Sequence, residues 1–126
     1  MSPPQFVDIE VVLDLHRAGL ARFGGAAGVR DMGAVEAALG AAQNAHFYGS
    51  EDLFGIAATY AYHIAQAQAF LDGNKRVAVA VALLFLAGNG IHGVPDADRL
   101  YDGMIGIAER RLTKSDLAQL FRELFG

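Results

Sequence analysis

The sequence predicts an all-α protein, a compact bundle of about six helices around a central apolar helix. Apolar residues recur at three- and four-residue spacing along most of the chain, which is the period of one helix face. Glycines and capping residues interrupt these segments where helices end and begin. Alternating strand patterns are poor, and at most a short hairpin flap fits within residues 43–50.

The first predicted helix runs from Ile9 to Phe23, where Gly24-Gly25 ends it and a glycine-rich loop follows. A second helix is predicted to begin near Asp31, whose carboxylate can cap free N–H groups. The stretch from Gln43 to Ser50 has no clear period. We expect it to be a connection and a flap over a site.

The third predicted helix starts near Leu53 and ends at about Gln68, where residues 69–73 break the apolar pattern and form a loop. A fourth helix begins at Asn74 and carries apolar residues on every side, which is typical of a helix at the centre of a bundle. The last two helices are predicted from Pro95 to about Arg110 and from Thr113 onward.

Length and composition predict one domain over residues 1–126, because two separate cores at this length would each be marginal. Hydrophobic residues make up 53% and charged residues 19%, which favours a well-filled core over disorder. The longest apolar run, Val77 to Ala87, is about half of what a membrane-spanning helix needs. We expect a buried helix there and no membrane partner.

The charge balance argues against nucleic acid as a partner. Ten Lys and Arg against fourteen Asp and Glu give a net charge of −4, so no overall basic field attracts a phosphate backbone. The chain contains no Cys, and its start lacks the basic and apolar regions of a signal peptide. Both observations favour the cytoplasm.

Residues 68–76 carry the chemistry, because they lie where a loop passes into the fourth helix. A helix start exposes unpaired N–H groups and the positive end of the dipole, so Gly73 and Asn74 can wrap an anion. Lys75 and Arg76 place positive charge at the positive end of the dipole, which is unfavourable unless a bound anion offsets it. Arg76 can form bidentate hydrogen bonds with phosphate oxygens, and Lys75 adds a point charge. Asp72 offers a hard oxygen ligand to Mg²⁺.

The alternative is an ordinary turn with a capping residue and a solvated Lys-Arg patch. The wider sequence favours the site, since residues 70–76 resemble the core of the Doc/Fic signature H-x-F-x-D/E-G-N-G/K-R. Residues 21–25, 28–31 and 86–90 also resemble Doc-family sequence in the same order. The resemblance covers about residues 6–125.

The resemblance implies a helical domain that uses a nucleotide, usually ATP with Mg²⁺, to modify a hydroxyl group of a target protein. It implies that Phe70, Gly73, Asn74, Lys75 and Arg76 bind phosphate and that Asp72 holds the metal. Asp72, Lys75 and Arg76 are also the expected catalytic residues, together with the residue at position 68.

Lys75 places the chain nearer the Doc branch, because nucleotidyl-transferring members tend to have Gly at that position. The Doc branch is associated with phosphoryl transfer to the translation elongation factor Tu. The inhibitory motif S/T-x-x-x-E-G/N of some Fic proteins is not present: Ser50 is followed four residues later by Phe54 and Ser115 by Gln119. We therefore expect a separate antitoxin whose disordered segment folds as an amphipathic helix in a groove beside the motif.

The sequence departs from the family at its first motif position. The family has a His there that takes the proton from the target hydroxyl, and this chain has Gln68, which has no titratable group near neutral pH. A degenerate member, an enzyme with changed chemistry and a sequence altered for production all remain open. His63, five residues earlier, lies on another helix face and is expected to be structural.

Two functions follow from this departure. The first is a Doc-like toxin of a toxin-antitoxin system whose transfer of a phosphoryl or nucleotidyl group is impaired or altered by Gln68. The second is a non-catalytic interaction module that keeps the fold and binds a nucleotide or an antitoxin without turnover.

Overall fold

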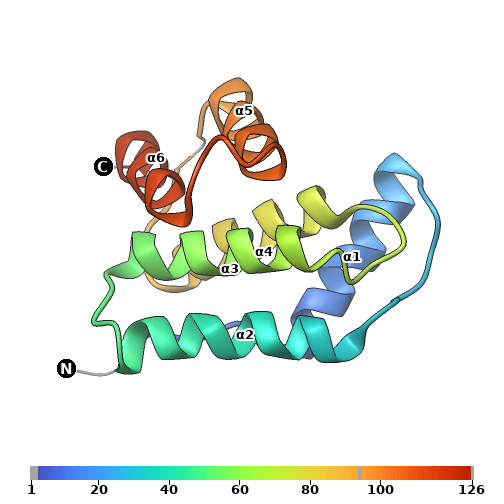
Figure 1. Cartoon of the computed structure of the whole chain (residues 1–126), viewed down its shortest axis with the longest axis horizontal. Coiled ribbons are helices and arrows are strands. Elements are labelled where there is room, and N and C mark those ends of the chain that lie inside the picture. The colour runs from blue at the N-terminus through green and yellow to red at the C-terminus, as the bar shows by residue number, and fades with distance from the viewer. Residues whose placement is uncertain (1–2, 94, 126) are drawn as a thin grey trace.

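The computed structural model describes residues 3–93 and 95–125, and within them the chain forms six helices and no named strand (Figure 1). The all-α prediction is therefore confirmed. None of the described helices is both long and apolar enough to cross a membrane. The helices are α1 (Ile9–Phe23), α2 (Met32–Phe47), α3 (Leu53–Ala67), α4 (Asn74–Gly88), α5 (Ala97–Ala108) and α6 (Lys114–Phe125).

Aspartates start most of these helices. The carboxylate before α1, α2, α3 or α5 accepts a hydrogen bond from a backbone N–H of the first turn, as an N-cap does. At the start of α6, Thr113 N donates to Asp116 (2.8 Å) and Asp116 N donates to the Thr113 hydroxyl (3.1 Å). Helix α4 differs, because Gly73 precedes it and no side chain caps it. The capping carboxylates belong to Asp8, Asp31, Asp52 and Asp96.

Helix α3 lies at the centre of the bundle and packs against α2, α4, α5 and α6. Figure 1 shows it between α2 on one side and the α5–α6 pair on the other. The expectation that the helix from Asn74 is central was wrong: α4 packs mainly on α3 and α1, and its Leu84 is exposed. Much of the buried face of α3 is alanine, including Ala57, Ala58 and Ala61. Alanines allow close packing but contribute little to a hydrophobic pattern.

The predicted connection at residues 43–50 was also wrong, because α2 continues through it to Phe47. Alanine-rich sequence extends the helix, since Ala is the best helix former. The helix ends where Tyr48 N and Gly49 N both donate to the Asn44 carbonyl, at 2.9 and 3.1 Å. No hairpin flap forms there. The segment beside the motif loop is instead the loop after α1, joined to it by an isolated bridge between Val29 and Phe70 (Figure 1).

Gln5 and Val7, which precede α1, form hydrogen bonds with residues that are distant in the sequence. Gln5 and the Asn89 side chain exchange two bonds, of 2.7 and 3.0 Å. Val7 N donates to the Tyr60 hydroxyl at 2.9 Å, and the Tyr60 side chain is completely buried in α3. The segment before α1 is thereby held against α3 and α4.

Helix α6 is held on α3 at the opposite end. The Arg122 guanidinium donates to both carboxylate oxygens of Asp52, each at 3.1 Å. This hydrogen bond to Arg122 is the main reason why the pKa of Asp52 is lowered. The pair is exposed to solvent, so the buried Leu117 and Phe121 of α6 contribute more to the packing.

We expect Tyr60→Phe to lower the free energy of unfolding by about 1–3 kcal/mol, because the buried Val7 N–H loses its acceptor. Urea unfolding measures the change. Tyr48→Phe is the matched control: its side chain is 86% exposed, and we expect a change within about 0.5 kcal/mol. Equal effects of the two substitutions would contradict the role of the Tyr60 hydroxyl.

Candidate functional site

The loop between α3 and α4 forms one wall of a polar cleft of about 420 Å³. Nearly all of its lining comes from the motif predicted by sequence, and one further residue comes from α5. That residue, Tyr101, was missed, because only the packing of α5 brings it to the loop. The lining residues are Gln68, Leu71, Asp72, Gly73, Asn74, Lys75, Arg76 and Tyr101.

The start of α4 is open toward this cleft. Gly73 has a φ of 77°, in the left-handed region that glycine adopts without strain. The Asn74 side chain does not cap the helix: its Oδ1 accepts from Phe70 N at 3.1 Å and its Nδ2 donates to the Phe70 carbonyl at 3.0 Å. The first-turn N–H groups of α4 have no intrahelical partner and can receive an anion.

The side chain of Phe70, which was expected to bind phosphate, lies under the loop and is not among the residues that line the cleft. Its side chain is completely buried, and its ring stacks on His16 of α1, with ring centroids 3.9 Å apart. His16 Nε2 lies 2.7 Å from the carbonyl oxygen of Asp72 and donates a hydrogen bond to it. Phe70 and His16 therefore fix the motif loop against α1 on its buried side.

Asp72 is the single carboxylate among the lining residues. Its Oδ1 accepts from Gly73 N at 2.9 Å and its Oδ2 accepts from Ala26 N at 3.3 Å. The glycine loop must approach closely here, since a Cβ on Gly25 would lie 2.7 Å from Oδ2. Each oxygen keeps a further lone pair. One carboxylate together with phosphate oxygens suits Mg²⁺, so the residues present fit that ion.

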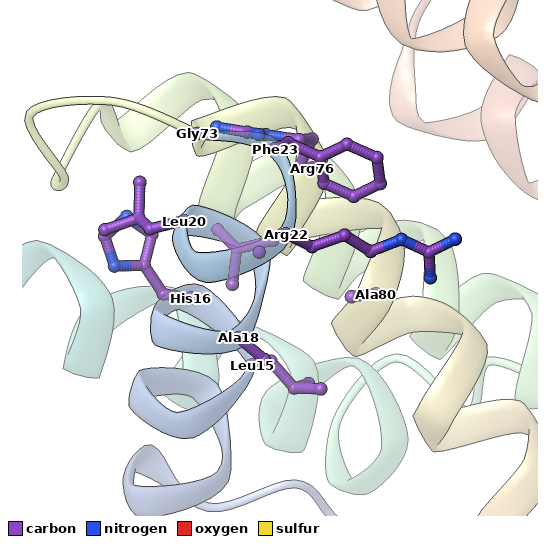
Figure 2. A pocket seen from close by; sticks show the side chains of 11 residues that line it. Leu15, His16, Ala18, Leu20, Arg22, Phe23, Gly73, Arg76 and Ala80 are labelled. Atoms are coloured by element: carbon purple, nitrogen blue, oxygen red, sulfur yellow. The ribbon is translucent and has the colours of Figure 1, made fainter. Parts of the chain in front are cut away.

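The two cations of the first turn of α4 both line the cleft but differ in their contacts. The Arg76 Nη2 donates to the Gly24 carbonyl at 3.0 Å, and its guanidinium lies 5.4 Å from the centre of the Phe23 ring. Figure 2 shows both side chains at the end of α1, beside a hollow of about 210 Å³ between α1 and α4. Lys75 is exposed. Arg76 keeps further N–H donors for a ligand in the cleft.

Gln68 ends α3 in the left-handed conformation, with φ 50° and ψ 38°. Its Nε2 donates to the Ala65 carbonyl at 2.9 Å, and its Oε1 accepts from Asn74 Nδ2 at 3.4 Å. Helices often end in this conformation, but glycine or asparagine is the usual residue there, and a residue with a longer side chain adopts it seldom. The side chain lines the cleft but has no proton-accepting group of useful pKa.

His63 does not replace the missing base. It is half-buried, and its Nε2 lies 3.2 Å from Lys114 Nζ of α6, on another side of α3. Burial, followed by the nearby Lys114 ammonium, lowers the pKa of His63. The imidazole therefore packs toward α6 as a structural group, outside the lining of the motif cleft.

The fold and the cleft define a class of helical proteins in which a glycine-containing loop leads into an uncapped helix with Lys and Arg in its first turn. The sequence pattern of the Fic/DOC family matches residues 6–86, and the chain belongs to this family. It is 39% identical over 118 residues to the protein kinase doc of Escherichia phage P1, with 93% of each chain covered. It is 38% identical over 127 residues to the toxin Doc of Mycolicibacterium smegmatis, covering 97% of this chain and 92% of that protein.

We expect His16→Leu to lower the free energy of unfolding by about 1–3 kcal/mol, since the Asp72 carbonyl loses its donor. Amide hydrogen exchange of residues 71–74 should become faster than in the unaltered protein. His92→Leu, at an exposed position, is the control and should change neither measurement. Unchanged exchange in His16→Leu would show that the loop is ordered without this contact.

Proposed function

We propose that this protein is a Doc-like toxin of a toxin-antitoxin system that acts in the cytoplasm. Its reaction is the transfer of a phosphoryl or nucleotidyl group from ATP to a hydroxyl group of a translation-related protein such as elongation factor Tu. The observation that carries the proposal is the uncapped start of α4, where Asp72, Lys75 and Arg76 line one cleft. The names of the two relatives, a protein kinase and a toxin, support it.

In this proposal the nucleotide phosphates lie over the backbone N–H groups of Gly73 to Lys75. Arg76 reaches the phosphate oxygens from the side of α1, and Lys75 approaches from the solvent. Asp72 would hold Mg²⁺, which would neutralise part of the phosphate charge. Tyr101 closes the far wall of the cleft.

Removal of the hydroxyl proton is the step of the reaction for which the cleft offers no suitable base. In phosphoryl transfer the target hydroxyl oxygen forms a bond to the γ-phosphorus, the bond to ADP breaks, and the hydroxyl proton must leave. Gln68 cannot accept that proton. We therefore propose that activity is impaired or altered, since loss of a general base typically reduces a rate by about 10²–10⁴-fold.

The alternative function is a non-catalytic module that binds a nucleotide or an antitoxin. The chemistry of Gln68 favours it, because the side chain lines the cleft and is held by Ala65 and Asn74 but offers no group that accepts a proton near neutral pH. Both functions keep the phosphate-binding loop. They differ in whether any group is transferred.

An apolar groove of about 360 Å³ beside the cleft supports an antitoxin partner. It runs between the end of α1, the exposed side of α4 and α5, and fits the apolar face of an amphipathic helix. Lys75, Arg76 and Tyr101 line both the groove and the cleft, so a helix bound there would lie against the nucleotide site. Its apolar walls include Phe23, Val79, Ala80, Leu83, Leu100 and Met104.

We expect Asp72→Ala combined with Arg76→Ala to weaken Mg·ATP binding at least about tenfold, because both remove charge-assisted contacts with the phosphates or their ion. The chain has no Trp, so Tyr101→Trp introduces a single tryptophan into the cleft wall, whose fluorescence can be excited selectively to report binding. The matched control is Asp14→Ala with Arg17→Ala, which removes an exposed ion pair of α1. Equal affinities of the two double variants would refute the assignment.

We expect Gln68→His to raise transfer by about two orders of magnitude or more and to make expression toxic in bacteria that lack the antitoxin. Histidine tolerates the left-handed conformation of position 68 better than most residues. ATP labelled at the γ- or the α-phosphate, incubated with elongation factor Tu, distinguishes phosphoryl from nucleotidyl transfer.

His63→Ala serves as the control for that experiment and should change transfer little in either background, because His63 contacts α6. If Gln68→His binds Mg·ATP yet transfers nothing and harms no cell, the non-catalytic function replaces the toxin.

A further inference from the structure

Phe23, the last residue of α1, exposes its aromatic ring beside the motif. The side chain is 63% exposed, whereas Phe70, Phe85 and Phe121 are buried in the core. An exposed ring removes little apolar surface from water, so core packing does not explain its position. The contacts of the ring point to a different role.

Two apolar hollows adjoin this ring. One is the hollow of about 210 Å³ between α1 and α4, and the other is the groove of about 360 Å³ between α4 and α5. Phe23 and Arg76 line both of them, and Arg76 also lines the motif cleft. Among the described residues, no other residue lines all three spaces. The ring and the Arg76 guanidinium therefore lie together where the three spaces adjoin.

The Arg76 guanidinium contacts three groups at this point. Its Nη2 donates to the Gly24 carbonyl at 3.0 Å, and its Cζ lies 5.4 Å from the centre of the Phe23 ring, within the range of a cation–π interaction. A Cβ at position 73 would lie 3.1 Å from Nη2, so the guanidinium approaches the start of α4 closely because Gly73 has no side chain. Figure 2 shows Phe23, Gly73 and Arg76 together at this end of α1.

No carboxylate competes for Arg76 within residues 3–93 and 95–125. Arg76 forms no ion pair there, and the Asp72 carboxylate in the cleft bonds instead to the backbone of Gly73 and Ala26. A neutral ring and a carbonyl attract a guanidinium without neutralising its charge. Arg76 is therefore ordered in position but keeps its positive charge for an anion.

Arg22 also lies over the ring, with its Cζ 5.2 Å from the ring centre. It lines the hollow between α1 and α4 but not the motif cleft. The contact between Phe23 and Arg22 therefore does not reach the phosphate site. The effect of the ring on that site passes through Arg76.

We propose that Phe23 is a positioning residue, whose ring orders the Arg76 guanidinium at the start of α4 before a phosphate group binds. An arginine side chain has several rotatable bonds, and fixing them on binding costs entropy. A guanidinium that is already ordered in the free protein avoids part of this cost. The inference rests on the proposed binding of Mg·ATP in the motif cleft.

Side-chain NMR of the free chain tests the positioning. In the ¹⁵N-labelled protein each arginine Nε–H gives its own signal, and that of Arg76 is identified as the one missing from Arg76→Ala. Phe23→Leu should shift this signal and speed its hydrogen exchange with water, because the ring current and the ordered contact are both lost. Phe23→Tyr keeps an aromatic face and should leave the signal close to its original position.

Titration of the same proteins with Mg·ATP, without any partner protein, tests the consequence. Phe23→Leu should weaken binding about two- to fivefold, which is the size expected of an exposed cation–π contact. Phe23→Tyr should keep the original affinity. Phe47→Leu is the matched control, because the Phe47 ring at the end of α2 is 59% exposed and no cation of the described residues lies over it. It should change neither the affinity nor the Arg76 signal.

Three results would overturn the proposal. These are an unchanged Arg76 signal in Phe23→Leu, equal losses of affinity in Phe23→Leu and Phe23→Tyr, and equal losses in Phe23→Leu and Phe47→Leu. The Arg76 signal is measured without nucleotide, so it tests the positioning separately from the proposed function. Absence of Mg·ATP binding by the unaltered chain would instead remove the phosphate site on which that function rests.

Discussion

The candidate site depends on a pair of hydrogen bonds between the Asn74 side chain and the backbone of Phe70. A side-chain amide at the first residue of a helix could bond to N–H groups of the first turn. The amide of Asn74 instead bonds to the backbone of Phe70 and closes the turn that precedes the helix. The residue before it, Gly73, has no side chain that could cap α4. The start of α4 therefore stays open, while the turn that precedes it is fixed. A rigid turn followed by unpaired N–H groups is the geometry that phosphate binding requires.

Contacts far apart in the sequence keep this turn in place. His16 reaches the Asp72 carbonyl across 56 positions of the chain, and Ala26 reaches the Asp72 carboxylate across 46. The Arg76 guanidinium, at the start of α4, donates a hydrogen bond to the Gly24 carbonyl in the glycine loop. A short loop of this composition would be mobile on its own, so its order comes from α1 and the glycine loop. Ordering the loop during folding lowers the entropy that a ligand must overcome on binding.

Local signals in the sequence predicted most of the helices, and packing decided what they did not. The helices predicted from near Asp31, Pro95 and Thr113 begin within two residues of those positions, because capping depends on neighbouring residues alone. The continuation of α2 to Phe47 and the central place of α3 were missed, since alanine-rich segments carry a weak hydrophobic pattern. In the site, position 68 and residues 72–76 line one cleft as the motif indicated. The burial of Phe70 and the arrival of Tyr101 depend on α1 and α5, which no local motif encodes.

The packing of α6 on α3 has a consequence for the order of events during synthesis. Ribosomes release a chain from its N-terminus, and a domain folds once the segments that bury its apolar surface have emerged. The central helix ends at Ala67, but the helix that covers one of its sides begins at Lys114. A nascent chain that has already exposed the phosphate loop therefore still lacks the surface that closes the bundle. The residues of the site are made midway, and the bundle that carries them is closed only when α6 docks on α3.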